Sequence, residues 1–221
     1  MRYGKAIGAR FYEDGSPRRF PGNTVVADVT PEVSAYPVLN AIRRRLEEEG
    51  YGNELILMPG ESYHMTFLQG INDQNRTPDR WPVALPLDAS MREADAFFQN
   101  AVLRAGLPGR VKMKFNSIGL SENCVIIRLD PADEEQNRIL RSFRDRAATQ
   151  LGHFIPGHDS YRFHITLAYV RVVPEGERAQ RLREILDEAE RRIRLEKPFF
   201  TTEPYIAFFS DMLSFPKKRR D

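Results

Sequence analysis

A four-residue phrase occurs twice in this chain, and this repetition is its most constraining feature. Residues 64–67 read His-Met-Thr-Phe and residues 164–167 read His-Ile-Thr-Leu. In an extended strand, alternate side chains share a face, so each copy carries an imidazole and a hydroxyl on one face and two apolar groups on the other. If the apolar faces pack inward, the two polar faces can border one cleft. Either copy alone is also typical of an ordinary strand with one polar face, so it is the pair that favours a functional site.

The composition is typical of a globular protein. The chain has 221 residues, of which 41% are hydrophobic and 29% charged. A net charge of +2 gives no reason to expect nucleic-acid binding through overall charge. The single cysteine, Cys124, cannot form an internal disulfide, and its apolar neighbours indicate a buried, inert thiol. No apolar run approaches the roughly 18 residues that cross a bilayer, and no signal peptide is recognisable. We therefore expect a cytoplasmic protein that does not enter a membrane.

Helices and strands alternate along the chain, and several strands are joined by short turns, which favours an α+β fold. The expected strands are residues 5–12, 24–29, 54–58, 62–69, 111–120, 123–129, 161–172 and one or two strands within 199–209. The expected helices are residues 37–49, 90–105, 133–151 and 175–196. We predict a single bilobal domain over residues 1–221, in which each lobe contributes one of the strands 62–69 and 161–172. Residues 72–88 are rich in Pro, Asn and Asp and are expected to form an insertion loop packed by Trp81.

Two imidazoles and two hydroxyls suit acid–base chemistry on a phosphoryl group. A neutral imidazole can remove a proton from water, and an imidazolium can donate one to a departing oxygen, because the unperturbed pKa is near 6.5. Threonine hydroxyls can donate to the non-bridging phosphate oxygens. The sequence thus predicts His64 and His164 as catalytic residues and Thr66 and Thr166 as phosphate-binding residues.

Further side chains near the two phrases are candidates for substrate contacts: Ser62, Tyr63, Arg162, Tyr169, Asn23 and Trp81. By strand alternation, Ser62 shares the face of His64, and Arg162 shares the face of His164. Four of these candidates have a simpler structural alternative. Ser62 and Arg162 can be strand-end residues, Asn23 can belong to a plain turn, and Trp81 can pack the long loop.

The sequence predicts no metal and no cofactor. His153, His158, Asp159 and His164 are close in sequence, but their spacing matches no zinc pattern. No phosphate-cradling glycine loop and no dinucleotide fingerprint is present.

The paired phrases resemble the signature of the 2H phosphoesterase superfamily, which includes the LigT-like RNA 2′,3′-cyclic phosphodiesterases. Residues 20–24 (Phe-Pro-Gly-Asn-Thr) and 62–66 (Ser-Tyr-His-Met-Thr) resemble a poorly characterised bacterial and fungal branch. The resemblance implies a bilobal fold with two pseudo-symmetric antiparallel-sheet lobes, helices outside and a central cleft. It also implies that His64 and His164 form the acid–base pair and that Thr66 and Thr166 bind phosphate. The chain departs from the classical members after the second phrase. They often carry a basic residue soon after it, whereas Arg171 here comes only after Ala-Tyr-Val.

The expected function is metal-independent hydrolysis of a cyclic or strained phosphodiester by a cyclic phosphodiesterase-like hydrolase. The expected partner is a small phosphodiester, a 2′,3′-cyclic nucleotide or an RNA end, and no obligate protein partner is inferred. Two alternatives stay open on the sequence alone. One is a non-catalytic module that binds a phosphorylated ligand or RNA end in the same cleft, and the other is a metal-assisted hydrolase.

Overall fold

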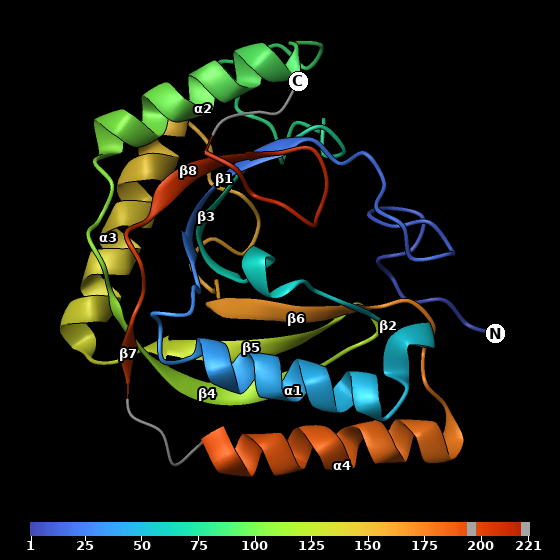
Figure 1. Ribbon diagram of the computed structural model, residues 1–221. Helices are drawn as coiled ribbons and strands as arrows, with labels where there is room; N and C mark the ends of the chain where they lie inside the picture. Colours follow the sequence, from blue (N-terminus) through green and yellow to red (C-terminus); the bar gives the residue numbers. More distant parts are fainter. Residues whose placement is uncertain (194–197, 218–221) are drawn as a thin grey trace.

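The computed structural model describes residues 1–193 and 198–217, which form an α+β fold around an antiparallel sheet (Figure 1). The strands are β1 (Gly22–Asp28), β2 (Leu55–Leu57), β3 (His64–Asn72), β4 (Lys112–Leu120), β5 (Cys124–Pro131), β6 (His164–Val170), β7 (Phe199–Phe200) and β8 (Tyr205–Phe209). The helices are α1 (Tyr36–Glu48), α2 (Met91–Ala105), α3 (Glu134–Leu151) and α4 (Gly176–Ile193), with short 3-10 turns at Tyr51–Asn53 and Gly60–Ser62. The strand order is β7-β4-β5-β6-β3-β1-β8, and β2 pairs with β6. The predicted α+β class with an antiparallel sheet is therefore confirmed.

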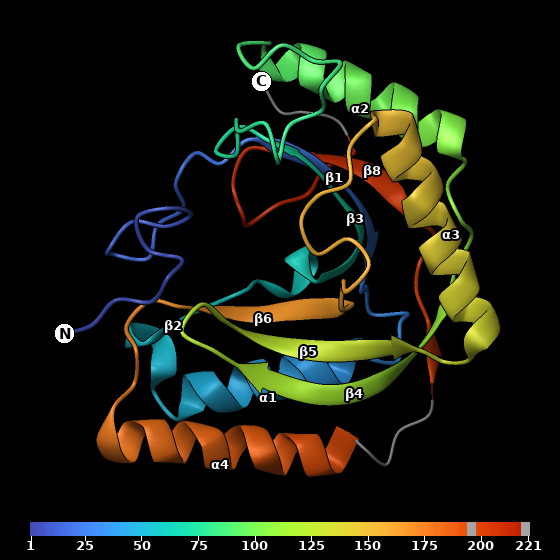
Figure 2. The same cartoon turned by 180° about the vertical axis from the view of Figure 1, so that it is seen from behind.

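The strands that carry the two phrases, β3 and β6, are neighbours in the sheet. They meet at only one residue pair, Met65 with Ile165, and farther along β6 the short strand β2 takes the pairing position instead. This narrow junction separates β1, β3 and β8 from the remaining strands. Helix α2 covers the first group, α3 packs against α2 and contacts both β3 and β5, and α1 and α4 lie side by side along the second group (Figures 1 and 2). We propose these two groups of strands and helices as the two lobes of one domain.

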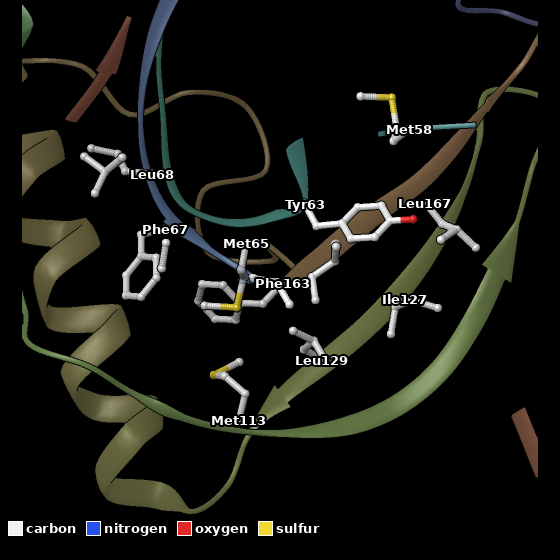
Figure 3. Packing of buried hydrophobic residues seen from close by; sticks show 14 of the residues in the cluster. Met58, Tyr63, Met65, Phe67, Leu68, Met113, Ile127, Leu129, Phe163 and Leu167 are labelled. Atoms are coloured by element: carbon white, nitrogen blue, oxygen red, sulfur yellow. The ribbon is translucent and has the colours of Figure 1, made fainter. Parts of the chain in front are cut away.

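The apolar residues of both phrases lie in the main hydrophobic core, as the alternation predicts. Met65, Phe67, Ile165 and Leu167 are fully buried, whereas the histidines and threonines between them are partly exposed. Figure 3 shows Met65, Phe67, Phe163 and Leu167 within one packed cluster that also includes Met113 and Ile127. Burial of side chains of this size contributes roughly 1.5–3 kcal/mol each, so the apolar half of each phrase anchors the polar half.

Both strands contain a β-bulge at the same place, just after the threonine. In β3, Phe67 is an extra residue between the pairs Val26–Thr66 and Val25–Leu68. In β6, Leu167 is the extra residue between the pairs Ile126–Thr166 and Val125–Ala168. A bulge of this kind shifts the alternation by one residue, so two consecutive side chains are buried and the next one returns to the polar face. Gln69 and Tyr169 are those next residues, and both lie on the side of the histidines.

The N-terminal segment differs from the expectation. Residues 5–12 were predicted as a strand and instead form turns with isolated bridges, so that prediction is wrong. The segment packs through its own small apolar cluster, made of Ala6, Phe11, Phe20, Phe209 and Met212. Gly4 is tightly enclosed, because a Cβ there would lie 2.0 Å from the carbonyl oxygen of Val170. Side-chain packing and close backbone contacts, rather than a ladder of hydrogen bonds, hold this segment on the sheet.

Several helix boundaries agree with the sequence. Ser90 caps α2 in a reciprocal capping box with Glu93, and Asp133 caps α3. The predicted C-terminal end of the last helix, residues 194–196, lies outside the described residues. Within residues 1–193 and 198–217, no helix has the length and apolar character needed to cross a membrane.

Candidate functional site

A cavity of about 440 Å³ opens beside the junction of β3 and β6, and both phrases line it. His64 and Thr66 reach it from β3, and His164 and Thr166 reach it from β6. The fold thus brings together four polar side chains from two segments 100 residues apart.

The two histidines are held in the same way. Nδ1 of His64 lies 2.8 Å from the carbonyl oxygen of Ser62, and Nδ1 of His164 lies 3.0 Å from that of Arg162. A carbonyl oxygen only accepts hydrogen bonds, so each Nδ1 is the protonated nitrogen that donates. In the neutral ring, Nε2 then carries the free lone pair and is the atom available for proton transfer.

Both imidazoles are held in the neutral form near neutral pH. Burial lowers the pKa of His64 to about 4, against the opposing hydrogen bond to Ser62, and the nearby charge of His164 lowers it further. The pKa of His164 is also lowered, mainly by burial and additionally by Arg128, which pairs with it across β5 and β6. In the free protein, both rings are therefore neutral near pH 7 and leave Nε2 unprotonated.

One wall of the cavity is aromatic and comes mainly from the segment after β8, which the sequence patterns did not indicate as part of a site. The ring of Phe215 lies 4.0 Å from the imidazole of His64, measured between centroids. Phe209, Met212 and Phe20 line the same wall. The segment after β8 is held in place by the Tyr205 hydroxyl, which lies 2.7 Å from Oδ1 of Asp28 and 2.9 Å from the carbonyl oxygen of Phe215. No local pattern links this segment to His64, since the two are far apart in sequence.

Tyr161 also lines the cavity, with its ring centroid 6.3 Å from that of His164. Behind it lies Arg144, which is fully buried and has its guanidinium carbon 4.1 Å from the Tyr161 ring centroid. Nη1 of Arg144 donates to the carbonyl oxygen of Phe67, the extra residue of the β3 bulge. The matching carbonyl oxygen in β6, that of Leu167, accepts from the backbone N–H of Met58. Each bulge therefore has a partner that holds its geometry next to the site.

Three of the predicted contact residues line the cavity: Ser62, Tyr169 and Asn23. The Ser62 hydroxyl donates to the carbonyl oxygen of Pro59 at 2.8 Å. The amide of Asn23 is engaged on both sides, because its Oδ1 accepts from the backbone N–H of Ile71 and its Nδ2 donates to Asp95. Asn23 thus ties β1 to β3 and α2, and its place beside the cavity is explained by this structural role.

The other three predicted contact residues, Tyr63, Arg162 and Trp81, are not part of the cavity lining. Tyr63 is buried among the core residues that Figure 3 shows. Arg162 precedes the start of β6 and is exposed, so strand alternation does not apply to its side chain. Trp81 is buried, donates from Nε1 to the carbonyl oxygen of Pro86, and stacks against Arg76, so it packs the loop as its structural alternative predicts. Substrate contact by these three side chains therefore requires a different geometry from the one observed.

Charge on the cavity lining is of one sign. Within the described part of the chain, the lining contains Arg10 and Arg80 and no aspartate or glutamate. Cys124 also lines the cavity and is only partly buried, contrary to expectation, but burial still raises the pKa of its thiol. A lining with two imidazoles, hydroxyls and guanidinium groups but no carboxylate favours an anionic ligand and offers poor ligands for a hard cation.

Comparison with solved structures reveals a close fold match. The conserved protein of unknown function ATU0111 from Agrobacterium tumefaciens str. C58 superimposes with a TM-score of 0.85 at 28% identity, over 97% of this chain and 91% of that one. LigT of E. coli gives a TM-score of 0.46 at 12% identity, over 86% of this chain and 88% of that one. TT0787 of Thermus thermophilus gives a TM-score of 0.43 at 16% identity, over 86% of this chain and 87% of that one. No curated protein matches the chain.

Comparison with protein families places the chain more directly. The model of the 2H-phosphodiest family, described as a domain of unknown function (DUF1868), matches residues 10–123. This match spans more than half of the 221 residues and includes the first phrase on β3. The chain therefore belongs to the 2H-phosphodiest family of domains of unknown function (DUF1868), and its membership indicates a phosphodiesterase-type enzyme.

Proposed function

We propose that this protein hydrolyses a cyclic or strained phosphodiester, of the 2′,3′-cyclic nucleotide or RNA-end type, without a metal ion. In this proposal His64 and His164 are the acid–base pair, and Thr66 and Thr166 donate to the phosphate oxygens. The observation that supports it is the equivalence of the two imidazoles. Each is tethered through Nδ1 to a carbonyl oxygen two residues earlier, and both line one cavity that has no carboxylate among the described residues of its lining.

The proposed reaction balances with these groups alone. One neutral imidazole takes a proton from water at Nε2 while the water oxygen attacks phosphorus. The other, protonated at Nε2, donates to the ribose oxygen that leaves, so one P–O bond forms and one breaks. The products are a phosphomonoester and a free hydroxyl. Each positioned proton transfer typically contributes about 10²–10⁴-fold to the rate.

The low pKa values in the free protein fit this scheme. The base must be neutral, and burial keeps both rings neutral near pH 7. The acid must be protonated, and a bound phosphate anion next to the second ring favours its charged form. The substrate would thus supply the charge that converts one of two similar rings into the acid. A cavity of about 440 Å³ is within the range that accommodates a nucleotide-sized ligand.

The test is a hydrolysis screen with nucleoside 2′,3′-cyclic phosphates and short RNAs ending in a cyclic phosphate. The same substrates are run with wild type, His64→Ala and His164→Ala, in the presence and absence of a chelator. We expect turnover by the wild type, loss in both variants and no effect of the chelator. Tight binding without turnover across the panel would instead support a non-catalytic phosphate-binding module. Loss of activity with chelator would contradict the metal-independent mechanism.

A further inference from the structure

The cavity contains a guanidinium group that has no acidic partner. Of the two arginines on its lining, Arg80 has its Nε 3.7 Å from Oδ2 of Asp79. Arg10 makes no ion pair within residues 1–193 and 198–217, and its buried Nε has no hydrogen-bond partner there. A permanently charged guanidinium group without an acidic partner is stabilised when an anion accepts hydrogen bonds from its N–H groups, so this end of the cavity is suited to an anion.

The position of Arg10 is fixed by the folded N-terminal segment. Its backbone N–H donates to the carbonyl oxygen of Ala6, and its own carbonyl oxygen accepts from the N–H of Arg18. The next residue, Phe11, is buried with its ring 5.0 Å from that of Tyr169. Arg10 is therefore held in the cavity wall by packed residues and is not a surface side chain that reaches the cavity by chance.

The guanidinium group is oriented by two aromatic rings. Its central carbon lies 5.4 Å from the ring centroid of Phe20 and 5.8 Å from that of Tyr169. Stacking of this kind holds the planar group while its N–H donors stay available at the edges. The fork of donors in arginine matches two oxygens of one phosphate, whereas a lysine would supply only a point charge.

The Arg10 end is distinct from the position between the imidazoles. Tyr169 follows His164 by five residues along β6, which corresponds to roughly 16 Å of strand. The β6 bulge turns Tyr169 toward the cavity, so the ring that supports Arg10 and the imidazole of His164 border one continuous space. One elongated ligand can therefore reach both.

We infer that Arg10, supported by Phe20 and Tyr169, binds a second phosphate of the substrate, separate from the phosphodiester that is cleaved. This inference rests on the proposed function and narrows its substrate to a nucleotide or RNA end with at least two phosphate groups. A nucleoside 2′,3′-cyclic phosphate with a 5′-phosphate is the smallest ligand of this class.

The experiment measures binding by calorimetry with two product-like probes, adenosine 3′-monophosphate and adenosine 3′,5′-bisphosphate. The proteins are wild type, Arg10→Gln, Arg10→Lys and the matched control Arg18→Gln. Arg18 lies in the same N-terminal segment and stacks on Tyr12, outside the cavity lining. The melting temperature of each variant reports whether the segment stays folded, and Arg10→Lys keeps the positive charge if the glutamine variant is destabilised.

We expect the second phosphate to tighten binding about tenfold in wild type and Arg18→Gln, and at most about twofold in Arg10→Gln, with Arg10→Lys between them. An equal gain in Arg10→Gln, or no gain in wild type, overturns the inference. If the monophosphate binds and inhibits turnover of cyclic phosphates but the second phosphate adds nothing, only the role of Arg10 is wrong. If neither probe binds and no cyclic phosphate is cleaved, the proposed function fails as well.

Discussion

The imidazole of His64 packs against the ring of Phe215, with ring centroids 4.0 Å apart and planes inclined by 48°, and both residues line the cavity. The two residues are far apart in the chain, and the contact excludes water from one side of the imidazole. Burial is the largest cause of the low pKa of His64, which is about 4. The C-terminal segment therefore lines the candidate site and also helps to lower the pKa of His64.

This contact gives a direct prediction. Phe215→Ala should raise the pKa of His64 from about 4 toward its ordinary value near 6.5, because water regains access to the charged form. The pKa is measured by NMR titration of the imidazole Cε1–H resonance. Phe200→Ala removes another partly exposed phenylalanine, one that stacks on Lys112, and should leave the titration of His64 unchanged. An unaltered His64 titration in Phe215→Ala would show that other neighbours cause the shift.

The pH dependence of activity should be displaced to the acid side. If one imidazole must be neutral and the other protonated, the active form of the free enzyme exists between the two pKa values of the pair. Both are lowered from 6.5, so kcat/KM should have its maximum below pH 6.5 and should fall as pH rises above it. The alkaline limb of kcat should lie at higher pH than that of kcat/KM, since bound phosphate favours the imidazolium. A value of kcat/KM that rises steadily from about pH 6 to 8 would contradict this assignment.

Removal of either imidazole should abolish turnover without unfolding the protein. We expect His64→Ala and His164→Ala each to reduce kcat by about 10²–10⁴-fold, and the double variant to lose less than the product of the two. His153→Ala is the control, because His153 lies outside the lining of this cavity. Circular dichroism and melting temperature check the fold. Full activity in either single variant would remove that histidine from the mechanism.

The hydroxyl groups of Thr66 and Thr166 should increase kcat/KM by donating hydrogen bonds to the phosphate oxygens of the substrate. Thr66→Val and Thr166→Val keep the shape of the side chain and delete one donor, so each should lower kcat/KM by about 10- to 100-fold. Thr149→Val provides the comparison, since this exposed threonine on α3 donates only to the carbonyl oxygen of Asp145. The measurement is steady-state kinetics on one cyclic phosphate. A kcat/KM equal to that of wild type in all three variants would exclude a role for both hydroxyls.

Strand alternation was enough to predict the polar and apolar faces of both phrases, because each strand has one buried and one open side. It was not enough for the residues after each phrase, since the bulges at Phe67 and Leu167 shift the alternation by one residue. The sequence does carry a pattern that is consistent with the bulges: in each copy, two apolar residues in succession follow the threonine. By contrast, the contribution of Arg10 and Phe215 depends on packing between segments far apart in sequence. Local patterns carry no information about such contacts, which is also why residues 5–12 were wrongly predicted as a strand.

Asn23 lines the same cavity, and a variant at this position can distinguish a structural role from a role in substrate binding. Its Oδ1 accepts from the Ile71 N–H at 2.7 Å, its Nδ2 donates to Asp95 at 2.9 Å, and Gly70 leaves it room, since a Cβ there would lie 2.2 Å from Oδ1. Asn23→Ala should therefore lower the free energy of unfolding by about 3 kcal/mol, because it leaves the buried Ile71 N–H without its acceptor, and should reduce Tm by roughly 6–12 °C.

The matched comparison for this variant is Asn75→Ala, which alters a partly exposed loop residue on the same cavity and should change stability by less than about 0.5 kcal/mol. Urea unfolding gives both values. Measured below the melting transition, kcat/KM of Asn23→Ala should stay close to that of wild type, because the amide is already occupied by protein groups and has little left to offer a substrate. A large loss of kcat/KM with unchanged stability would reverse this interpretation and make Asn23 a substrate contact.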